Sequence, residues 1–398
     1  MRSPTLKFII FLFFLNCSKE TIQKEFLIFQ DPYNSNSSSS GSDNINSGSD
    51  NINQRLKKSP CENGMASIYP CKGYDFVSRI TLDEFESKSG NDNWGWTDPE
   101  TGIEYVISGL NDGTAFVSIE DPENPIYLGK LPTSTFSSDY RDIKVYNSHA
   151  FIVSEAPEHG LQVFDLTRLR GLTEFQSFDA DVTLQDFGSA HNIAINEESG
   201  FAFVVGSNLY QGGPVFIDVN DPKKPKIVGG FETASYTHDA QIIIYRGPDE
   251  NYQGKELLFG SNSDGGANNK IVILDVTDKK NPEWIQSIFY ENGGFTHQGY
   301  LTEDHRYFFL GDELDEINYG TPTSTRIFDL TDLSNPKLHL NYYASLSAID
   351  HNGYIKGDQF FMASYTAGLR VLDISSIEEK RIEEIGFFDS YPLDNDTK

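Results

Sequence analysis

The chain has 398 residues, of which 38% are hydrophobic and 13% aromatic, so it can bury a large core. Its formal net charge of −28 argues against nucleic acid and anionic membrane surfaces as partners, because both require basic patches on the protein. The same charge suits solubility outside the cell or the binding of cations.

Residues 1–17 have the pattern of an export signal. Arg2 and Lys7 give a positively charged start, and the apolar stretch that follows is too short to span a bilayer. The segment resembles a bacterial lipoprotein signal, although Asn16 stands where Gly, Ala or Ser is common before the cysteine. We expect Cys17 to be lipidated, which would anchor the protein in the cell envelope, on the outer membrane and exposed at the surface. An ordinary signal peptide is the alternative.

The next segment, 18–55, is expected to be a flexible tether. Between residues 31 and 54 it is dominated by Ser, Asn and Gly, and such a composition cannot bury apolar surface. Cys61 and Cys71 follow, and in an exported protein this short spacing predicts a local disulfide. The remaining chain is assigned to one folded domain, 60–392, and a tail, 393–398.

Six repeats of short, β-branched and aromatic strands occupy this domain. We expect the third strand of each repeat to end in an acid, and these acids are Glu120, Asp165, Asp218, Asp275, Asp329 and Asp373. A period of roughly 45 to 55 residues built from short strands is typical of β-propellers with one blade per repeat. The fold class is therefore all-β, a propeller of four-stranded blades with the first strand of each blade lining a central channel.

The entries to the first strands form columns when the repeats are aligned by distance to the second strand. One column contains Trp94, Arg141, His191, His238, His297 and His351. The next column contains Gly95, Asp142, Asn192, Asp239, Gln298 and Asn352. Four of the eight histidines thus share one column, which is the strongest functional indication in the sequence.

The loops after the second strands end at the same mouth of the channel and supply further polar groups. The ligand-binding residues that we expect there are Arg141, Asp142, Glu155, Asp239, Asp312 and Glu313. Neutral imidazoles favour a transition metal such as Zn²⁺ over Ca²⁺, so His191, His238, His297 and His351 are candidate metal ligands. Two interpretations stay open, since a histidine in every copy can also be a structural hydrogen-bonding group that ties one blade to the next.

Other acidic positions have different explanations. Asp218, Asp221, Asp275, Asp278, Asp329 and Asp332 are expected to form turns by capping local backbone N–H groups. The segment GDELDEINYG (311–320) is a longer acidic loop found in the fifth repeat alone, on the face of the candidate site. The sequence contains no G-x-S-x-G, H-E-x-x-H or P-loop motif.

Long strings such as NDNWGWTDPETGIEYVISGLNDG, YTHDAQIIIYRGPD and FTHQGYLTEDHRYFFLGDELDE resemble the choice-of-anchor B family, whose blades are LVIVD-type repeats. The resemblance extends over about residues 60 to 392. It implies an exported, surface-displayed bacterial propeller, and it implies no particular reaction.

Closure of the ring leaves two alternatives. The segment 73–82 is expected to be an outermost strand, although no inner strands precede it. Either the chain closes as six blades with this strand laid on an edge, or it is a truncated form of a seven-bladed design. We expect the second.

Two functions from different classes compete. The first is a non-enzymatic module that binds an extracellular protein or glycan from a lipid-anchored position. The second is a metal-dependent hydrolase or lyase that uses the histidine column, with Asp239 or Glu313 as general base.

Overall fold

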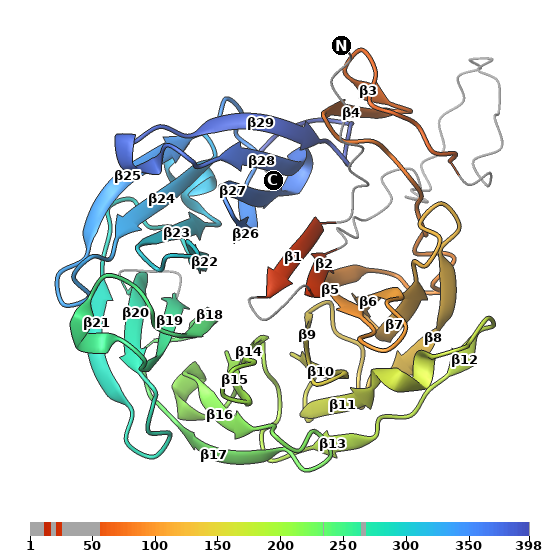
Figure 1. The fold of residues 1–398 in the computed structure, drawn as a ribbon, viewed down its shortest axis with the longest axis horizontal. Coiled ribbons are helices and arrows are strands. Elements are labelled where there is room, and N and C mark those ends of the chain that lie inside the picture. The colour runs from red at the N-terminus through yellow and green to blue at the C-terminus, as the bar shows by residue number, and fades with distance from the viewer. Residues whose placement is uncertain (1–11, 17–20, 26–55, 234, 264–267, 398) are drawn as a thin grey trace, which may run out of the picture.

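The computed structural model describes residues 12–16, 21–25, 56–233, 235–263 and 268–397. Within them the chain forms six blades around a central channel, and Figure 1 shows the ring viewed along this channel. Each blade is an antiparallel four-stranded sheet, which confirms the expected fold class. No helix in these residues is long and apolar enough to cross a membrane. Cys17 and nearly all of the segment assigned to a tether lie outside the described residues.

The strands of each blade follow one another in sequence from the channel to the rim. Blade one contains β5(Gly90–Thr97), β6(Glu104–Leu110), β7(Gly113–Ser118) and β8(Ile126–Pro132). Blade two contains β9(Arg141–Tyr146), β10(His149–Ser154), β11(Leu161–Asp165) and β13(Val182–Leu184). Blade three contains β14(Asn192–Asn196), β15(Phe201–Val205), β16(Val215–Asp218) and β17(Lys226–Gly230).

The second half of the ring repeats this order. Blade four contains β18(Thr237–Ile244), β19(Glu256–Asn262), β20(Lys270–Asp275) and β21(Glu283–Ile288). Blade five contains β22(Thr296–Leu301), β23(Tyr307–Asp312), β24(Ser324–Asp329) and β25(Lys337–Tyr343). Blade six contains β26(Asp350–Lys356), β27(Gln359–Ser364), β28(Gly368–Asp373) and β29(Glu383–Phe388).

Short elements complete the described fold. The helices are α1(Asp315–Tyr319) and the 3-10 turns η1(Leu166–Leu169), η2(Tyr210–Gly212), η3(Glu250–Tyr252), η4(Tyr365–Ala367) and η5(Ile377–Glu379). The strand β12(Gln176–Ser177) pairs in parallel with β8 and so ties blade two to blade one. Two further strands, β1(Leu12–Asn16) and β2(Thr21–Glu25), form a hairpin that lies between β26 and β5 (Figure 1).

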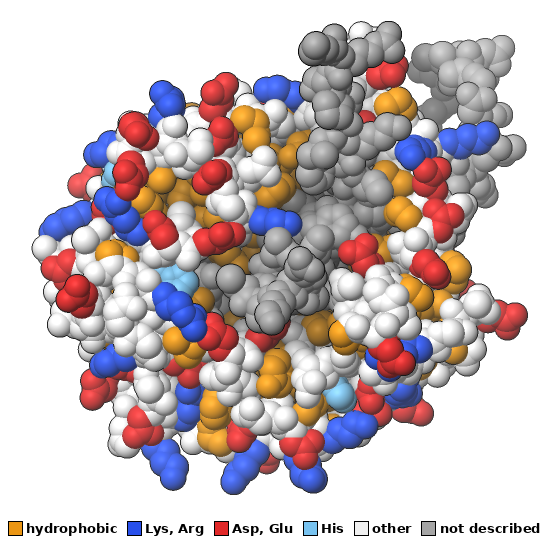
Figure 2. Space-filling view, viewed as in Figure 1, with side chains coloured by type: hydrophobic (Ala, Val, Ile, Leu, Met, Phe, Trp, Pro, Cys, Tyr) orange, Lys and Arg blue, Asp and Glu red, His pale blue; other side chains and the backbone are white. Residues whose placement is uncertain are grey.

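The blades pack face to face through buried apolar side chains. Between blades one and two, for example, the rings of Phe116 and Phe164 stack with their centroids 4.4 Å apart, and Phe178 covers both rings. The inner strands run side by side around the channel from β5 through β9, β14, β18 and β22 to β26. Figure 2 shows acidic side chains at many points around the visible rim, with basic side chains between them.

The turns after the third strands confirm the expected role of their aspartates. Asp218, Asp275 and Asp329 each accept a hydrogen bond from the backbone N–H two residues later, at 3.1, 3.0 and 2.8 Å. Blade one departs from the prediction, because β7 ends at Ser118 and Glu120 lies beyond the strand. The Ser118 hydroxyl accepts from the Glu120 N–H at 3.4 Å, so serine replaces the aspartate at this turn.

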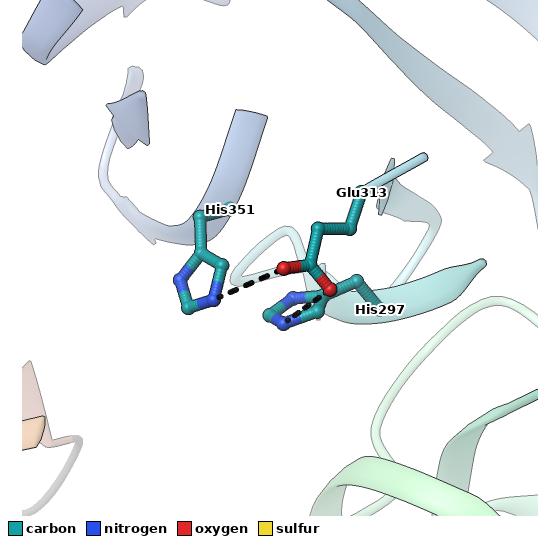
Figure 3. A group of neighbouring side chains, drawn as sticks. All are labelled: His297, Glu313 and His351. Carbon is teal, nitrogen blue, oxygen red and sulfur yellow. Dashed lines mark ion pairs between the residues drawn. The ribbon is translucent and has the colours of Figure 1, made fainter. Parts of the chain in front are cut away.

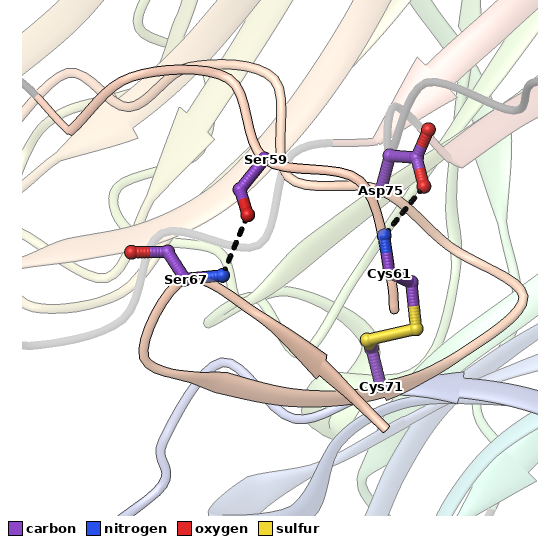
Figure 4. The surroundings of a disulfide bond; sticks show 5 residues. All are labelled: Ser59, Cys61, Ser67, Cys71 and Asp75. Carbon is purple, nitrogen blue, oxygen red and sulfur yellow. Dashed lines mark hydrogen bonds between the residues drawn. A yellow bond between two sulfur atoms is a disulfide. The ribbon is translucent and has the colours of Figure 1, made fainter. Parts of the chain in front are cut away.

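An N-terminal strand does lie on the outer edge of a blade, but residues 69–72 form it and not the predicted residues 73–82. The hairpin of β3(Met65–Ala66) and β4(Tyr69–Lys72) precedes residues 73–82, and β4 pairs with the outer edge of β29. A disulfide joins Cys61 to Cys71 of β4, as predicted (Figure 4). The Cys61 N–H also donates to Asp75 at 2.8 Å. Because β4 occupies the edge of the sixth sheet, residues 73–82 form isolated bridges and no strand.

Candidate functional site

The inner strands of three successive blades contain a β-bulge at the histidine position. His238 is the unpaired residue between Thr237 and Asp239 in β18, and His297 has the same place in β22. In β26 the bulge includes His351. A bulge adds one residue to a strand and redirects its side chain, as is common near functional sites. These histidines line a cavity of about 760 Å³ in the central channel.

The bulge also explains an error in the predicted columns. In β5 the unpaired residues are Asn91 and Asp92, so they occupy the places that we assigned to Trp94 and Gly95. Alignment by distance to the second strand does not count the bulged residues. For the first blade it therefore chose residues three positions too far along the chain. Trp94 lies in the core, where its ring makes an edge contact with Tyr354 at 6.4 Å between centroids.

Four imidazoles form a continuous row across blades three to six. The ring centroids of His191 and His238 are 4.2 Å apart, those of His238 and His297 are 4.2 Å apart, and those of His297 and His351 are 4.1 Å apart. Burial and the neighbouring imidazoles lower the pKa of His238 and of His297 well below the usual value. Burial also lowers the pKa of His351. Three of the four rings are therefore neutral at pH 7, as metal ligands must be.

The row divides into three kinds of contact. The Nδ1 atom of His191 lies 2.7 Å from a carboxylate oxygen of Glu155. His238 has its Nδ1 atom 2.9 Å from the backbone oxygen of His297, which is the blade-tying contact that the structural interpretation anticipates. His297 and His351 instead face Glu313, with their Nε2 atoms 3.5 and 4.0 Å from its two carboxylate oxygens (Figure 3).

His297, Glu313 and His351 have the arrangement of a metal-ligand set. One ligand atom from each residue lies within 4.8 Å of the others. Glu313 follows β23 directly, and its backbone N–H donates to the oxygen of Phe295 at 3.0 Å. The Tyr365 hydroxyl donates a short hydrogen bond to the Glu313 carboxylate and fixes its orientation. Two imidazoles and a carboxylate form a donor set suited to Zn²⁺, and three protein ligands leave a coordination position open.

Side chains of the next column link neighbouring blades, which is the role that the structural interpretation assigns to the histidines. Asp92 accepts a hydrogen bond from the N–H of Ile143 at 3.0 Å, and Asp142 accepts one from Ile193 at 2.8 Å. Gln298 likewise accepts from the N–H of Gly353 at 3.0 Å. Each of these side chains thus bonds to the inner strand of the following blade.

Asp142 and Asp239 also belong to a polar cluster that includes Lys144. Lys144 donates to Asp142 at 2.9 Å, and its ammonium group lies 4.4 Å from the centre of the Trp94 ring. Asp239 accepts from the Asn192 amide at 2.9 Å. Burial raises the pKa of Asp239 to about 7, while the nearby Lys144 opposes the shift.

Arg141 and Asp312, which we expected to bind a ligand, form hydrogen bonds within the protein. The side chain of Arg141 is fully buried, with Nε 3.0 Å from the backbone oxygen of Leu110 and Nη1 2.9 Å from Nε2 of His159. Asp312 is also fully buried, and its carboxylate accepts from the N–H groups of Gly294 and Phe295 and from the hydroxyl of Tyr290. These contacts place Asp312 in the packing of the blades, whereas Arg141 lines the cavity and its Nη2 atom is buried without a partner among the described residues.

Aromatic residues complete the cavity wall, and three of them, Tyr236, Phe295 and Tyr140, were not predicted. Tyr236 and Phe295 each stand two residues before a histidine of the row, with ring centroids 6.3 Å from His238 and 6.4 Å from His297. Tyr140 and Tyr365 also line the cavity. The repeated order of aromatic residue, threonine and histidine at 236–238 and 295–297 is the sequence signal that could have revealed the first two.

Comparison with known proteins supports the fold and no finer assignment. No family model matches the chain, and no curated protein matches its sequence. A functionally unknown protein from Desulfotomaculum acetoxidans is similar in structure, with a TM-score of 0.53 and 13% identity over 78% of this chain and 88% of that one. The periplasmic gluconolactonase of Pseudomonas aeruginosa has a TM-score of 0.50 and 10% identity over 74% of this chain and 87% of its own.

The class that fold and geometry define is a six-bladed β-propeller with a histidine-lined channel. The resemblance to the choice-of-anchor B family and the lipoprotein signal stay predictions.

Proposed function

We propose that the protein is a binding module that holds a Zn²⁺ ion at His297, Glu313 and His351 and uses it to bind a small, hydroxyl-rich ligand. The observation that carries the proposal is the convergence of these three side chains on one point of the channel (Figure 3). Neutral imidazoles and a carboxylate together favour Zn²⁺ over oxygen-seeking cations.

The surroundings of the ion suit a sugar unit of a glycan. A cavity of about 760 Å³ is in the size range of small-molecule sites. Its wall includes the carboxylates of Asp92, Asp142 and Glu155, which can accept hydrogen bonds from hydroxyl groups, and aromatic rings that can pack against a sugar face. Display from a lipidated Cys17 would give the channel access to extracellular glycans, and the predicted export signal supports this location.

The test is zinc content in the full chain after loading with Zn²⁺ and dialysis. We expect about one tightly held zinc per chain in the parent and none in the double variant H297A/H351A. The matched control is H339A, because His339 lies on the outer strand β25 and bonds to the backbone oxygen of Ile377, away from the channel. An absence of zinc in the parent, or its retention by H297A/H351A, would overturn the proposal.

A hydrolase is the second candidate, and the contact between Glu155 and His191 favours it. This pair lies on the wall of the same cavity as the three proposed ligands and could accept a proton from a zinc-bound water. A panel of chromogenic esters, lactones and glycosides would test turnover by the zinc-loaded chain. Turnover that E155Q slows without loss of zinc supports the hydrolase, whereas no turnover of any substrate leaves binding as the function.

A further inference from the structure

A second group of acidic residues lies buried between blades five and six, apart from the histidine row. Asp315 and Glu316 begin helix α1 in the loop 311–320, and Asp350 begins the inner strand β26. Their exposed fractions are 0%, 3% and 2%. A carboxylate oxygen from each residue lies within 4.8 Å of the other two.

Most of these oxygens have no hydrogen-bond donor among the described residues. Arg326 and Ser324 donate to one oxygen of Asp315, at 2.9 and 2.6 Å. The other oxygen of Asp315, both oxygens of Glu316 and one oxygen of Asp350 are buried without a partner. An unpaired buried carboxylate costs several kcal/mol, roughly, and one guanidinium cannot neutralise three of them. The point at which these three carboxylates meet therefore lacks a compensating positive charge.

The donor set and its spacing indicate which cation would fit. Every group is an oxygen, without imidazole or thiolate, and such sets are preferred by hard cations. Two oxygens bound to one Ca²⁺ at about 2.4 Å can be up to about 4.8 Å apart. The three carboxylates thus fit within the first coordination sphere of one calcium ion.

The backbone beside the group leaves room for the carboxylate of Asp350. Gly311 is the residue of β23 that faces it, and a Cβ atom at this position would lie 2.9 Å from a carboxylate oxygen of Asp350. On the other side, the hydroxyl of Ser364 is buried without a partner, at the position of β27 that pairs with Asp350. Any larger residue than glycine at 311 would displace the Asp350 carboxylate.

We infer that Asp315, Glu316 and Asp350 form a binding site for one Ca²⁺ ion that joins the loop of blade five to the inner strand of blade six. The ion supplies the positive charge that the buried carboxylates lack. When the ion is absent, burial and the neighbouring carboxylates raise the pKa of Glu316 to about 10 and that of Asp350 well above its usual value.

The experiment titrates CaCl₂ into the chelator-treated full chain and measures heat and thermal unfolding. To keep the proposed zinc site from contributing, the titration is repeated in the H297A/H351A background. We expect one Ca²⁺ per chain in both, with a rise in Tm of several degrees that E316Q and D350N each abolish. The matched control is D332N, because Asp332 is an exposed turn residue that accepts from its own loop. This variant should bind Ca²⁺ like the parent.

The response of Tm to CaCl₂ separates this inference from its alternative. If the cluster holds only protons, CaCl₂ leaves the Tm of the parent unchanged, as it does for E316Q and D350N. That result would overturn the inference. A failure of zinc binding would not affect it, since the two sites use different ligands.

Discussion

Arg141 and His159 show how a buried cation is kept without an ion-paired acid among the residues that the structure describes. The Nδ1 atom of His159 lies 2.9 Å from the backbone oxygen of Gly160, and its Nε2 atom is 2.9 Å from the guanidinium of Arg141. The only assignment that satisfies both contacts is a neutral ring that donates to Gly160 and accepts from Arg141. Burial, followed by the charge of Arg141, lowers the pKa of His159 to about 4.

This depressed pKa predicts a loss of stability in mild acid. The unfolded chain binds a proton at His159 below about pH 6.5, whereas the folded chain resists protonation down to about pH 4. Stability from this group is therefore complete above pH 6.5 and declines as the pH falls, by about 2 kcal/mol at pH 4.5. We expect the parent to lose that much more than H159Q between pH 7.5 and 4.5, measured by urea unfolding. Equal losses in the two proteins would refute the assignment.

At the scale of single residues, the sequence predicted which residue types line the channel. It predicted the contacts of each residue less well. The histidine column was visible because the blades repeat it, and Glu313 was predicted from its place after a second strand. The separate contacts of His191, His238, His297 and His351 depend on the direction of each ring, which column alignment does not contain. Asp350 lies far from the loop 311–320 in sequence, so its meeting with Asp315 and Glu316 could not be predicted.

The inner strands of blades five and six each contain a glycine that is covered by a phenylalanine ring, and blade four lacks this contact. Gly299 in β22 is covered by the ring of Phe308, and Gly353 in β26 is covered by Phe360 in the same way. An ideal Cβ on either glycine would lie 2.1 Å from the ring. In blade four the corresponding strand positions hold Ala240 and Leu258, so the smaller aliphatic side chain leaves space for a methyl group.

We therefore expect G299A to destabilise the protein by about 2 kcal/mol, the range of overpacked core sites. The double variant G299A/F308L should recover part of this loss, because leucine removes the ring that the new methyl group meets. Urea unfolding of the parent, both single variants and the double variant gives the coupling energy. A coupling energy near zero would show that Phe308 is not the cause.

At the scale of elements, the periodic parts of the chain were predictable and the irregular parts were not. The third strands and their aspartate turns repeat with nearly constant spacing, so hydrophobic pattern and turn chemistry both identified them. Bulges add residues that pattern matching cannot count, and this misplaced the column in β5. Residues 73–82 have the composition of a strand, but β4 and its disulfide already occupy the available edge of β29.

The two ends of the described ring meet at blade six. The strand β4 from the start of the domain pairs with β29 near its end, through Lys72 with Phe387 and Cys71 with Phe388. Tyr69 packs against both Phe76 and Phe388, with centroids 5.4 and 5.2 Å apart. The structure thus has six blades with an N-terminal strand laid on the outer edge of the last, and a seventh blade stays a prediction.

The disulfide should contribute to this closure because it restricts the unfolded segment between Cys61 and Cys71. A loop of this length is worth about 3 kcal/mol in the chain-entropy model. We expect C61S/C71S to lose up to that amount in thermal or urea unfolding, with release of β4 from β29 as the first step in hydrogen exchange. Dithiothreitol should lower the stability of the parent to that of the variant and leave the variant unchanged. If the two proteins unfold alike without reductant, the bond has no role in closure.

The loop after β23 and the start of β26 each contribute to both proposed ion sites. Glu313 faces the channel, and Asp315 and Glu316, two and three residues later, face the buried cluster. Asp350 belongs to the cluster, and the adjacent His351 to the channel.

An ion that fixes either set restrains the backbone of the other, so the two binding equilibria are thermodynamically linked. By reciprocity, Ca²⁺ would tighten Zn²⁺ binding by the same factor by which Zn²⁺ tightens Ca²⁺ binding. Calcium would then act as a regulator of the channel.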